Sequence, residues 1–120
     1  MPSNPDSAGI GAQMEAAAAV HLQRAGLRIE ARNYRCRRGE IDLIARDGKT
    51  LVFVEVRFRR HRHFGGAGAT VDGRKQRKLL AAAETYLQQY KQDCPCRFDV
   101  VAIEGSADNI QWITNAFGSD

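Results

Sequence analysis

The stretch that decides the fold is residues 40–58, EIDLIARDGKTLVFVEVRF, in which two apolar segments flank a short polar one. Residues 40–46 and 51–58 are rich in Val, Ile, Leu and Phe, which is typical of strands. Asp47-Gly48 between them is the strongest short-range hairpin signal in the chain. The stretch therefore predicts an antiparallel pair of central strands.

The register of this hairpin decides where its carboxylates lie, because side chains alternate between the two faces of a strand. A two-residue turn at Asp47-Gly48 places Glu40 opposite Glu55, whereas a four-residue turn places Asp42 opposite Glu55. A three-residue turn would scatter the apolar side chains, so burial argues against it. Both favoured registers separate a charged face from an aliphatic one: Glu40, Asp42, Glu55 and Arg57 against Ile41, Leu43, Val52, Val54 and Val56.

The charged face of the hairpin has two interpretations. Carboxylates that face each other on an apolar sheet repel and lose hydration, and a bound divalent cation such as Mg²⁺ offsets that cost. Alternatively, the face is an ordinary polar surface on which Glu55 and Arg57 form ion pairs. Glu15 would supply a further ligand if its helix packs across the acidic face.

The remaining pattern predicts one domain over residues 10–117, with the element order αβββαβ and a final β. Gly26 closes the first helix, and the second begins near Arg74. The expected segments are a disordered leader at 1–9, a helix at 11–25, a strand at 27–33, a basic connection at 34–38, a mobile loop at 62–73, a strand at 97–104, a short edge strand at 110–115 and a tail at 118–120. The core-facing stripe of the second helix is Leu79, Ala83, Tyr86, Leu87 and Tyr90.

The 120-residue chain carries a formal net charge of +4, and its basic residues are clustered. Such clusters are either solvated surface or a track for the phosphates of a nucleic acid. Tyr34 and Phe64, in segments expected to be loops, are candidates for stacking on unpaired bases. The predicted nucleic-acid-binding residues are Arg35, Arg38, Arg59, Arg60, Arg62, Arg74, Arg77 and Lys78.

The lack of a recognisable targeting signal, together with the cysteine usage, predicts a cytoplasmic protein. No segment approaches the about 18 consecutive apolar residues of a membrane span, and the N-terminus has no signal-peptide pattern. The odd number of cysteines, Cys36, Cys94 and Cys96, argues against a disulfide framework. We expect reduced thiols and no membrane partner.

Three segments resemble the YraN-like family, a small and poorly characterised bacterial family: GEIDLIA at 39–45, LVFVEVR at 51–57 and RFDVV at 97–101. The resemblance extends from about Glu15 to the Asn115-Ala116-Phe117 end. It implies kinship with archaeal Holliday-junction resolvases and the PD-(D/E)xK superfamily, hence a restriction-endonuclease-like α/β core in which helices flank a mixed sheet. It also implies a nuclease-type site that uses Mg²⁺ or Mn²⁺.

Site residues follow from that resemblance. Asp42 and Glu55 match the metal-binding acids, and Glu15 matches a helix Glu, although Met14 stands where glycine is common. Arg57 occupies the usual place of a catalytic lysine; it stays protonated, yet it can stabilise charge on a transition state. The implied catalytic residues are Glu15, Asp42, Glu55, Arg57 and Lys75, and the implied metal ligands are Asp42, Glu55, Glu15 and, as an auxiliary, Glu40.

Three function classes stay open at this stage. The leading hypothesis is a metal-dependent endonuclease-like phosphodiesterase that acts on DNA, either branched or single-stranded. The second is a noncatalytic nucleic-acid-binding module with a degenerate nuclease site. The third is a basic docking surface for an acidic protein. A homodimer is suggested by analogy with the resolvases only.

Overall fold

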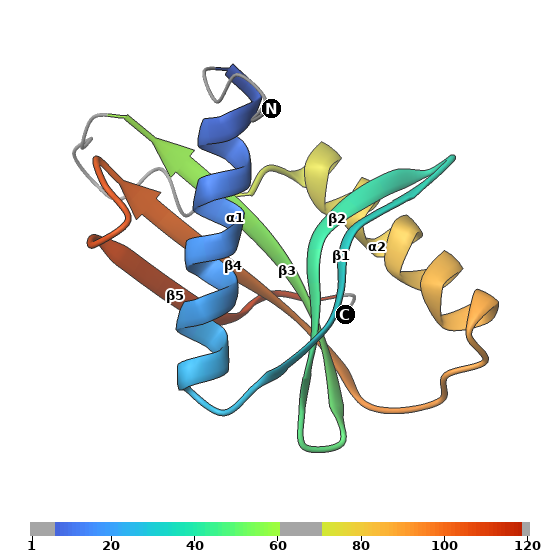
Figure 1. The fold of residues 1–120 in the computed structure, drawn as a ribbon. Coiled ribbons are helices and arrows are strands. Elements are labelled where there is room, and N and C mark those ends of the chain that lie inside the picture. The colour runs from blue at the N-terminus through green and yellow to red at the C-terminus, as the bar shows by residue number, and fades with distance from the viewer. Residues whose placement is uncertain (1–6, 61–70, 119–120) are drawn as a thin grey trace, which may run out of the picture.

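The computed structural model describes residues 7–60 and 71–118, and the order of its elements confirms the predicted αβββαβ arrangement with a final strand. The elements, coloured along the chain in Figure 1, are α1 (Ser7–Arg24), β1 (Arg28–Cys36), β2 (Gly39–Asp47), β3 (Thr50–Arg59), α2 (Gly73–Gln89), β4 (Cys96–Glu104) and β5 (Ile110–Phe117).

The strands form one five-stranded open sheet in the order β1-β2-β3-β4-β5. β3 and β4 are parallel, and every other neighbouring pair is antiparallel, so the sheet is mixed as expected. A parallel pair needs a long crossover, which α2 supplies. β5 lies at an edge of the sheet, which confirms the edge strand expected over 110–115.

The two helices cover opposite faces of the sheet. Ala18 and Leu22 of α1 pack with Leu43 and Val52, whereas Leu79 of α2 belongs to the other buried cluster. Figure 1 shows α1 crossing one face and α2 lying behind the β1–β2 hairpin. No helix in the described part of the chain is both long and apolar enough to cross a membrane.

Several element boundaries differ from the sequence prediction. α1 begins at Ser7 rather than at 11, so residues 7–9 of the expected leader are helical, while residues 1–6 lie outside the described residues. β1 continues to Cys36 through most of the expected basic connection, because it pairs with β2 along its length. Residues 61–70 of the expected loop, and 119–120 of the tail, also lie outside the described residues.

The β2–β3 register is the one that aligns Asp42 with Glu55, but the turn is tighter than a four-residue turn. Asp47 pairs with Thr50 and Leu43 pairs with Val54, which leaves Gly48 and Lys49 as the loop. Gly48 has a φ of 61°, a left-handed conformation that suits glycine at the first loop position of a type II′ turn.

Two predicted core placements are wrong. Ile41 packs in the α2-side cluster instead of beside Leu43, because β2 pairs with β3 no further than Leu43 and its N-terminal end, which is paired with β1, curls toward α2 (Figure 1). Tyr90 is 51% exposed, because α2 ends at Gln89 and Tyr90 is its C-cap. The other members of the predicted stripe are buried or partly buried against the core.

Candidate active site

Asp42 lies where the β1–β2 hairpin separates from β3. Its Oδ2 accepts the backbone N–H of Val56 at 2.8 Å, beyond the last strand pair, Leu43 with Val54. The side chain thus satisfies a backbone donor of β3 at the point where pairing with β2 ends. Burial raises the pKa of Asp42, and the Val56 N–H and the charge of Lys75 partly oppose that rise.

Glu55 is the neighbouring acid on β3 and is only 8% exposed. Its Oε2 lies 3.5 Å from the Lys75 ammonium, which comes from the first turn of α2. Burial and the nearby Asp42 charge raise the pKa of Glu55 to about 7, against the lowering effect of Lys75. At neutral pH this carboxyl is therefore protonated in a large fraction of molecules.

The two carboxyl groups act as a coupled pair. They share a side-chain hydrogen bond, which favours the charged form of Asp42 and requires a proton on its partner. The charge of Asp42 in turn raises the pKa of Glu55, so the two carboxyls resist ionising together. Two close carboxyls that cannot both ionise easily are a common feature of catalytic and cation-binding sites.

Lys75 owes its position to the start of α2. Asp72 caps the helix, and its Oδ1 accepts the backbone N–H of Lys75 at 2.9 Å. The cap fixes the first turn and so directs the lysine side chain toward β3. Asp72 and Lys75 both line the hollow beside Glu55.

Glu15 comes from α1, and its expected role as a metal ligand stays a prediction. Burial and then the charge of Asp42 raise the pKa of the half-buried Glu15, and a hydrogen bond from the Asn33 side chain lowers it. Glu15 therefore lies within electrostatic reach of Asp42, although α1 and α2 cover different faces of the sheet.

Asn33 is a site residue that the sequence did not single out. Its flanking pairs, Arg32 with Leu43 and Tyr34 with Ile41, place it opposite Asp42, and its φ is 53°. A left-handed residue inside a strand is uncommon and often marks a functional site. The only available sequence signal is an Asn inside an alternating strand, since Asn tolerates this conformation better than most residues.

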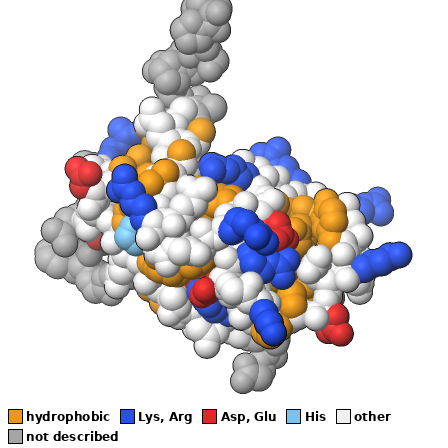
Figure 2. All heavy atoms as spheres, turned by 60° about the horizontal axis from the view of Figure 1, so that its bottom comes forward, with side chains coloured by type: hydrophobic (Ala, Val, Ile, Leu, Met, Phe, Trp, Pro, Cys, Tyr) orange, Lys and Arg blue, Asp and Glu red, His pale blue; other side chains and the backbone are white. Residues whose placement is uncertain are grey.

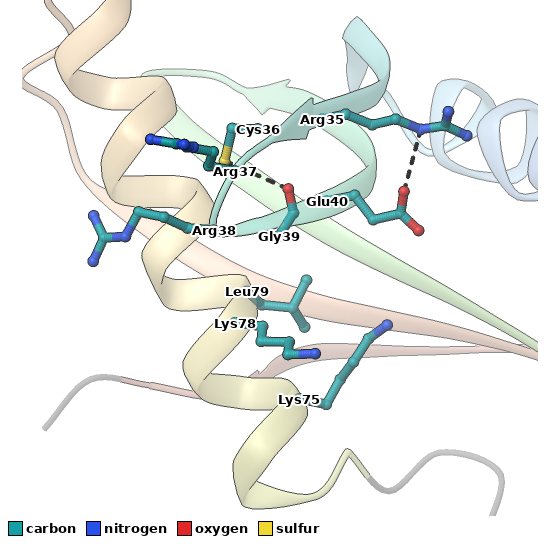
Figure 3. Close-up of a pocket in the computed structure, with 9 residues that line it drawn as sticks. All are labelled: Arg35, Cys36, Arg37, Arg38, Gly39, Glu40, Lys75, Lys78 and Leu79. Carbon is teal, nitrogen blue, oxygen red and sulfur yellow. Dashed lines mark hydrogen bonds and ion pairs between the residues drawn. The ribbon is translucent and has the colours of Figure 1, made fainter.

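Glu40, the fourth expected metal ligand, lies at the rim of the site. Its Oε2 is 3.2 Å from Arg35 Nε, and both side chains are well exposed. Figure 3 shows this pair above the space into which Lys75 and Lys78 point from α2. Glu40 influences the pKa of Asp42 and Glu15 by its charge, which fits an auxiliary position.

Arg57 lies two residues beyond Glu55 on β3 and lines the same hollow. Its charge lowers the pKa of Glu55, but less than the charge of Lys75 does. The nearest ammonium to the acidic pair thus comes from α2, and the guanidinium that replaces the expected lysine lies beside it on the strand.

Two hollows share Lys75 in their linings, and together they are called the basic cleft. One, of about 430 Å³, separates the hairpin tip from α2 and is lined by Arg35, Cys36, Arg37, Arg38, Gly39, Glu40, Lys75, Lys78 and Leu79. The other, of about 450 Å³, is lined by Glu55, Val56, Arg57, Phe58, Arg59, Asp72 and Lys75. Cations therefore line both hollows, and Glu55 lines the second of them.

The predicted nucleic-acid-binding residues are only partly gathered there. Arg35, Arg38, Lys78 and Arg59 line the cleft, joined by Arg37, which the sequence prediction left out of that set. Arg60, Arg74 and Arg77 are exposed but do not line the two hollows, and Arg62 lies outside the described residues. Figure 2 shows that Lys and Arg also spread over another face of the molecule, so positive charge alone does not mark the cleft.

The acidic pair has donor chemistry that suits a divalent cation. Two adjacent carboxylates are hard oxygen ligands, and a cation would offset the repulsion between their charges. Among residues 7–60 and 71–118, no three carboxylate, His or Cys groups converge into a metal-binding cluster as the side chains stand. Asp42 and Glu55 would be the primary ligands; Glu40 acts on the pKa of Asp42 by its charge, and Asp42 acts on that of Glu15.

The model of the "Uncharacterised protein family UPF0102" matches residues 14–103 of this chain. The chain belongs to the UPF0102 family. Members of the UPF0102 family with high similarity occur in several bacteria, and this agrees with the resemblance seen in the sequence.

Three of these UPF0102 relatives illustrate the similarity. The protein of Pseudomonas fluorescens is 50% identical over 111 residues, covering 91% of this chain and 92% of its own. That of Dechloromonas aromatica is 51% identical over 118 residues, covering 98% and 96%. That of Ectopseudomonas mendocina is 55% identical over 112 residues, covering 90% and 93%.

Proposed function

We propose that this protein is a nucleic-acid-binding, metal-dependent phosphodiesterase with a restriction-endonuclease-like core. The observation that carries the proposal is the pair of half-buried Asp42 and buried Glu55, in which Glu55 lies 3.5 Å from Lys75, a residue that lines both basic hollows. An anionic polymer suits the cleft, and a cation suits the pair.

The acidic and the basic residues of the site would have different roles in phosphodiester hydrolysis. Asp42 and Glu55 would hold a divalent cation, which when bound polarises a phosphate and lowers the pKa of a coordinated water. In hydrolysis, the water oxygen bonds to phosphorus, one P–O ester bond breaks, the leaving oxygen gains a proton and a phosphate monoester remains. Lys75 and Arg57 would stabilise the negative charge that builds on the phosphoryl oxygens.

The remaining cations would position the backbone. Arg35, Arg37 and Lys78 line the hollow on one side of Lys75, and Arg59 lines the hollow on the other side. Contacts of this kind are independent of sequence, because they recognise phosphate rather than bases. We therefore expect binding that weakens steeply as salt is raised.

Cleavage assays test the proposal. Labelled linear duplex, single-stranded and four-way-junction DNA, and single-stranded RNA, are incubated with Mg²⁺ or Mn²⁺ and the wild type, Asp42→Asn or Glu55→Gln. Asp108→Asn is the matched control, because Asp108 is exposed and lines a separate hollow against α1. We expect metal-dependent cleavage by the wild type and the control, and loss in both site variants.

A noncatalytic binding module is the second candidate. It is favoured by the fact that both acids already have partners, Val56 N–H for Asp42 and Lys75 for Glu55. Salt-sensitive binding without cleavage in either metal would support this candidate and contradict the first. Binding to neither DNA nor RNA would contradict both.

A further inference from the structure

A third hollow, of about 660 Å³, lies between β1 and the C-terminal end of α2, outside the acidic pair. Its lining differs from that of the basic cleft because it combines aromatic rings, side-chain amides and arginines. The lining residues are Glu30, Ala31, Arg32, Asn33, Tyr34, Arg35, Tyr86, Gln89, Tyr90 and Gln92.

Three tyrosines form the wall of this hollow. The ring of Tyr86, only 5% exposed, is anchored by its hydroxyl, which donates to Glu30 Oε2 at 2.7 Å. Tyr34 meets it edge-on at a centroid distance of 5.1 Å, and Tyr90 packs against it at 4.7 Å. Tyr90 is one of the few large hydrophobic side chains in the described chain that stay exposed, at 51%. A buried ring thus holds an exposed one in place.

The polar groups around these rings leave the hollow without a net negative charge. Arg46 binds Glu30 through paired contacts of 3.0 and 3.2 Å, so the one acid of the lining is neutralised. Arg32 and Arg35 are exposed cations at its side. The amides of Gln89 and Gln92 can both donate and accept hydrogen bonds, and Tyr34 already donates to Gln89 Oε1 at 2.8 Å.

The hollow borders the basic cleft at Arg35, which contributes to the lining of both. A phosphate bound by Arg35 would therefore lie at the edge of the hollow that Tyr90 also lines. Exposed aromatic rings beside a phosphate-binding arginine suit single-stranded nucleic acid, because every base has a face that can stack. A base held in a duplex is already stacked and paired and would not reach the wall.

We propose that this hollow is a subsite for an unpaired base, with Tyr90 as its exposed stacking surface, in a strand whose backbone runs through the basic cleft. The inference rests on the nucleic-acid binding proposed above, and it narrows the ligand to strands with unpaired bases. It does not depend on catalysis, since Tyr90 lies outside the acidic pair.

The test compares Tyr90→Ala with Tyr90→Phe, which keeps the ring. The probe is a short single-stranded DNA carrying the fluorescent base aminopurine, measured in EDTA at low salt, with the matching duplex beside it. Val20→Ala serves as the control, because Val20 is also an exposed large apolar residue, at 42%, but lies on α1.

We expect the wild type, Tyr90→Phe and Val20→Ala to quench aminopurine on binding. Tyr90→Ala should bind the single strand about tenfold more weakly, within the range for loss of one stacked base, and should bind the duplex as the wild type does. Thermal unfolding verifies that the variants are folded.

The outcomes separate the two proposals. Equal single-strand binding by Tyr90→Ala and the wild type, or an equal loss on the duplex, would overturn the subsite and leave the basic cleft standing. Failure of the wild type to bind any nucleic acid at low salt would overturn the proposed function and the subsite together. Binding with the expected pattern but no cleavage in Mg²⁺ would support the subsite and count against catalysis only.

Discussion

Lys75 Nζ lies 3.5 Å from Glu55 Oε2 and links the first turn of α2 to the interior strand β3. Lys75 is 40% exposed at its side chain, whereas the Glu55 side chain is 10% exposed, so a solvated cation faces a buried acid. Removal of Lys75 would therefore leave a buried acid without its cation, whereas removal of Glu55 would leave only a solvated ammonium group.

Replacement of Lys75 should change the protonation of Glu55. Lys75→Met keeps the length of the side chain and removes the charge that lowers the pKa of Glu55, so this pKa should rise above about 7. NMR titration of the Glu55 carboxyl carbon measures it. Lys78→Met is the control, because Lys78 lies one turn further along α2 in the same cleft. An unchanged pKa in Lys75→Met would contradict the ion pair.

Glu55 itself should make the protein less stable as pH rises. Its pKa moves from an ordinary 4.5 to about 7, so the folded state binds more protons than the unfolded state between these values. Stability should therefore fall as pH rises from about 4.5 to about 7, and stay low above it.

The variant Glu55→Gln tests this, because its neutral amide mimics the protonated acid. At pH above 7 we expect it to be more stable than the wild type by about 1 to 3 kcal/mol, with the gap closing toward pH 5 in urea denaturation. Glu84→Gln, at an exposed acid of α2, should show no such gap. A Glu55→Gln protein that is equally destabilised at both pH values would contradict the raised pKa.

Asp99 should be a strong determinant of stability. It is fully buried, and it accepts hydrogen bonds from Arg97 Nε at 3.0 Å, Trp112 Nε1 at 3.0 Å and the Asn115 backbone N–H at 2.9 Å. Asp99→Ala would leave these donors without an acceptor, at a cost of about 3 kcal/mol or more. Urea denaturation measures it, with exposed Asp108→Ala as the reference. A loss below about 1 kcal/mol, the usual worth of one hydrogen bond, would argue against this network.

The backbone and the amide of Asn33 can be separated by two substitutions. Asn33→Ala keeps neither the tolerance for a φ of 53° nor the contact with Glu15, and should cost about 1 to 2 kcal/mol of stability. Asn33→Gly restores the backbone freedom but not the side-chain amide. Any loss of stability that remains in Asn33→Gly therefore measures the contact with Glu15. The double variant Asn33→Gly/Glu15→Gln provides the check. If the loss comes from the contact with Glu15, Asn33→Gly should cause no loss of stability when Glu15→Gln is already present.

The sequence predicts the fold well where the apolar pattern is regular. Alternation along residues 40–58 identifies the hairpin and puts Asp42 and Glu55 on one face, since any odd shift would expose Val52 and Val54; it leaves open whether Glu40 or Asp42 lies opposite Glu55, which the structure decides in favour of Asp42. It cannot anticipate where β2 stops pairing with β3. Beyond the end of that pairing, Ile41 lies on the other face of the sheet.

The site is predicted less completely, because it depends on contacts between distant segments. Asp42, Glu55 and Lys75 were expected to act together, and the structure brings them into contact. Asn33 can be identified as a site residue only from its left-handed backbone conformation and its position opposite Asp42, both of which require the structure. Tyr90 continues the helical spacing of the core stripe, yet α2 ends one residue before it and leaves it exposed.

The close approach of Gly39 to α2 links the shape of the cleft to one missing methyl group. A Cβ at Gly39 would lie 2.9 Å from the Lys78 carbonyl oxygen, so any larger residue must push the hairpin tip away from the helix. The β2–β3 pairs from Leu43 to Asp47 could stay intact during such a movement, because the tip lies beyond them. The hairpin tip could thus move about a pivot near Asp42, and its angle to the helix would set the width of the hollow between the tip and α2.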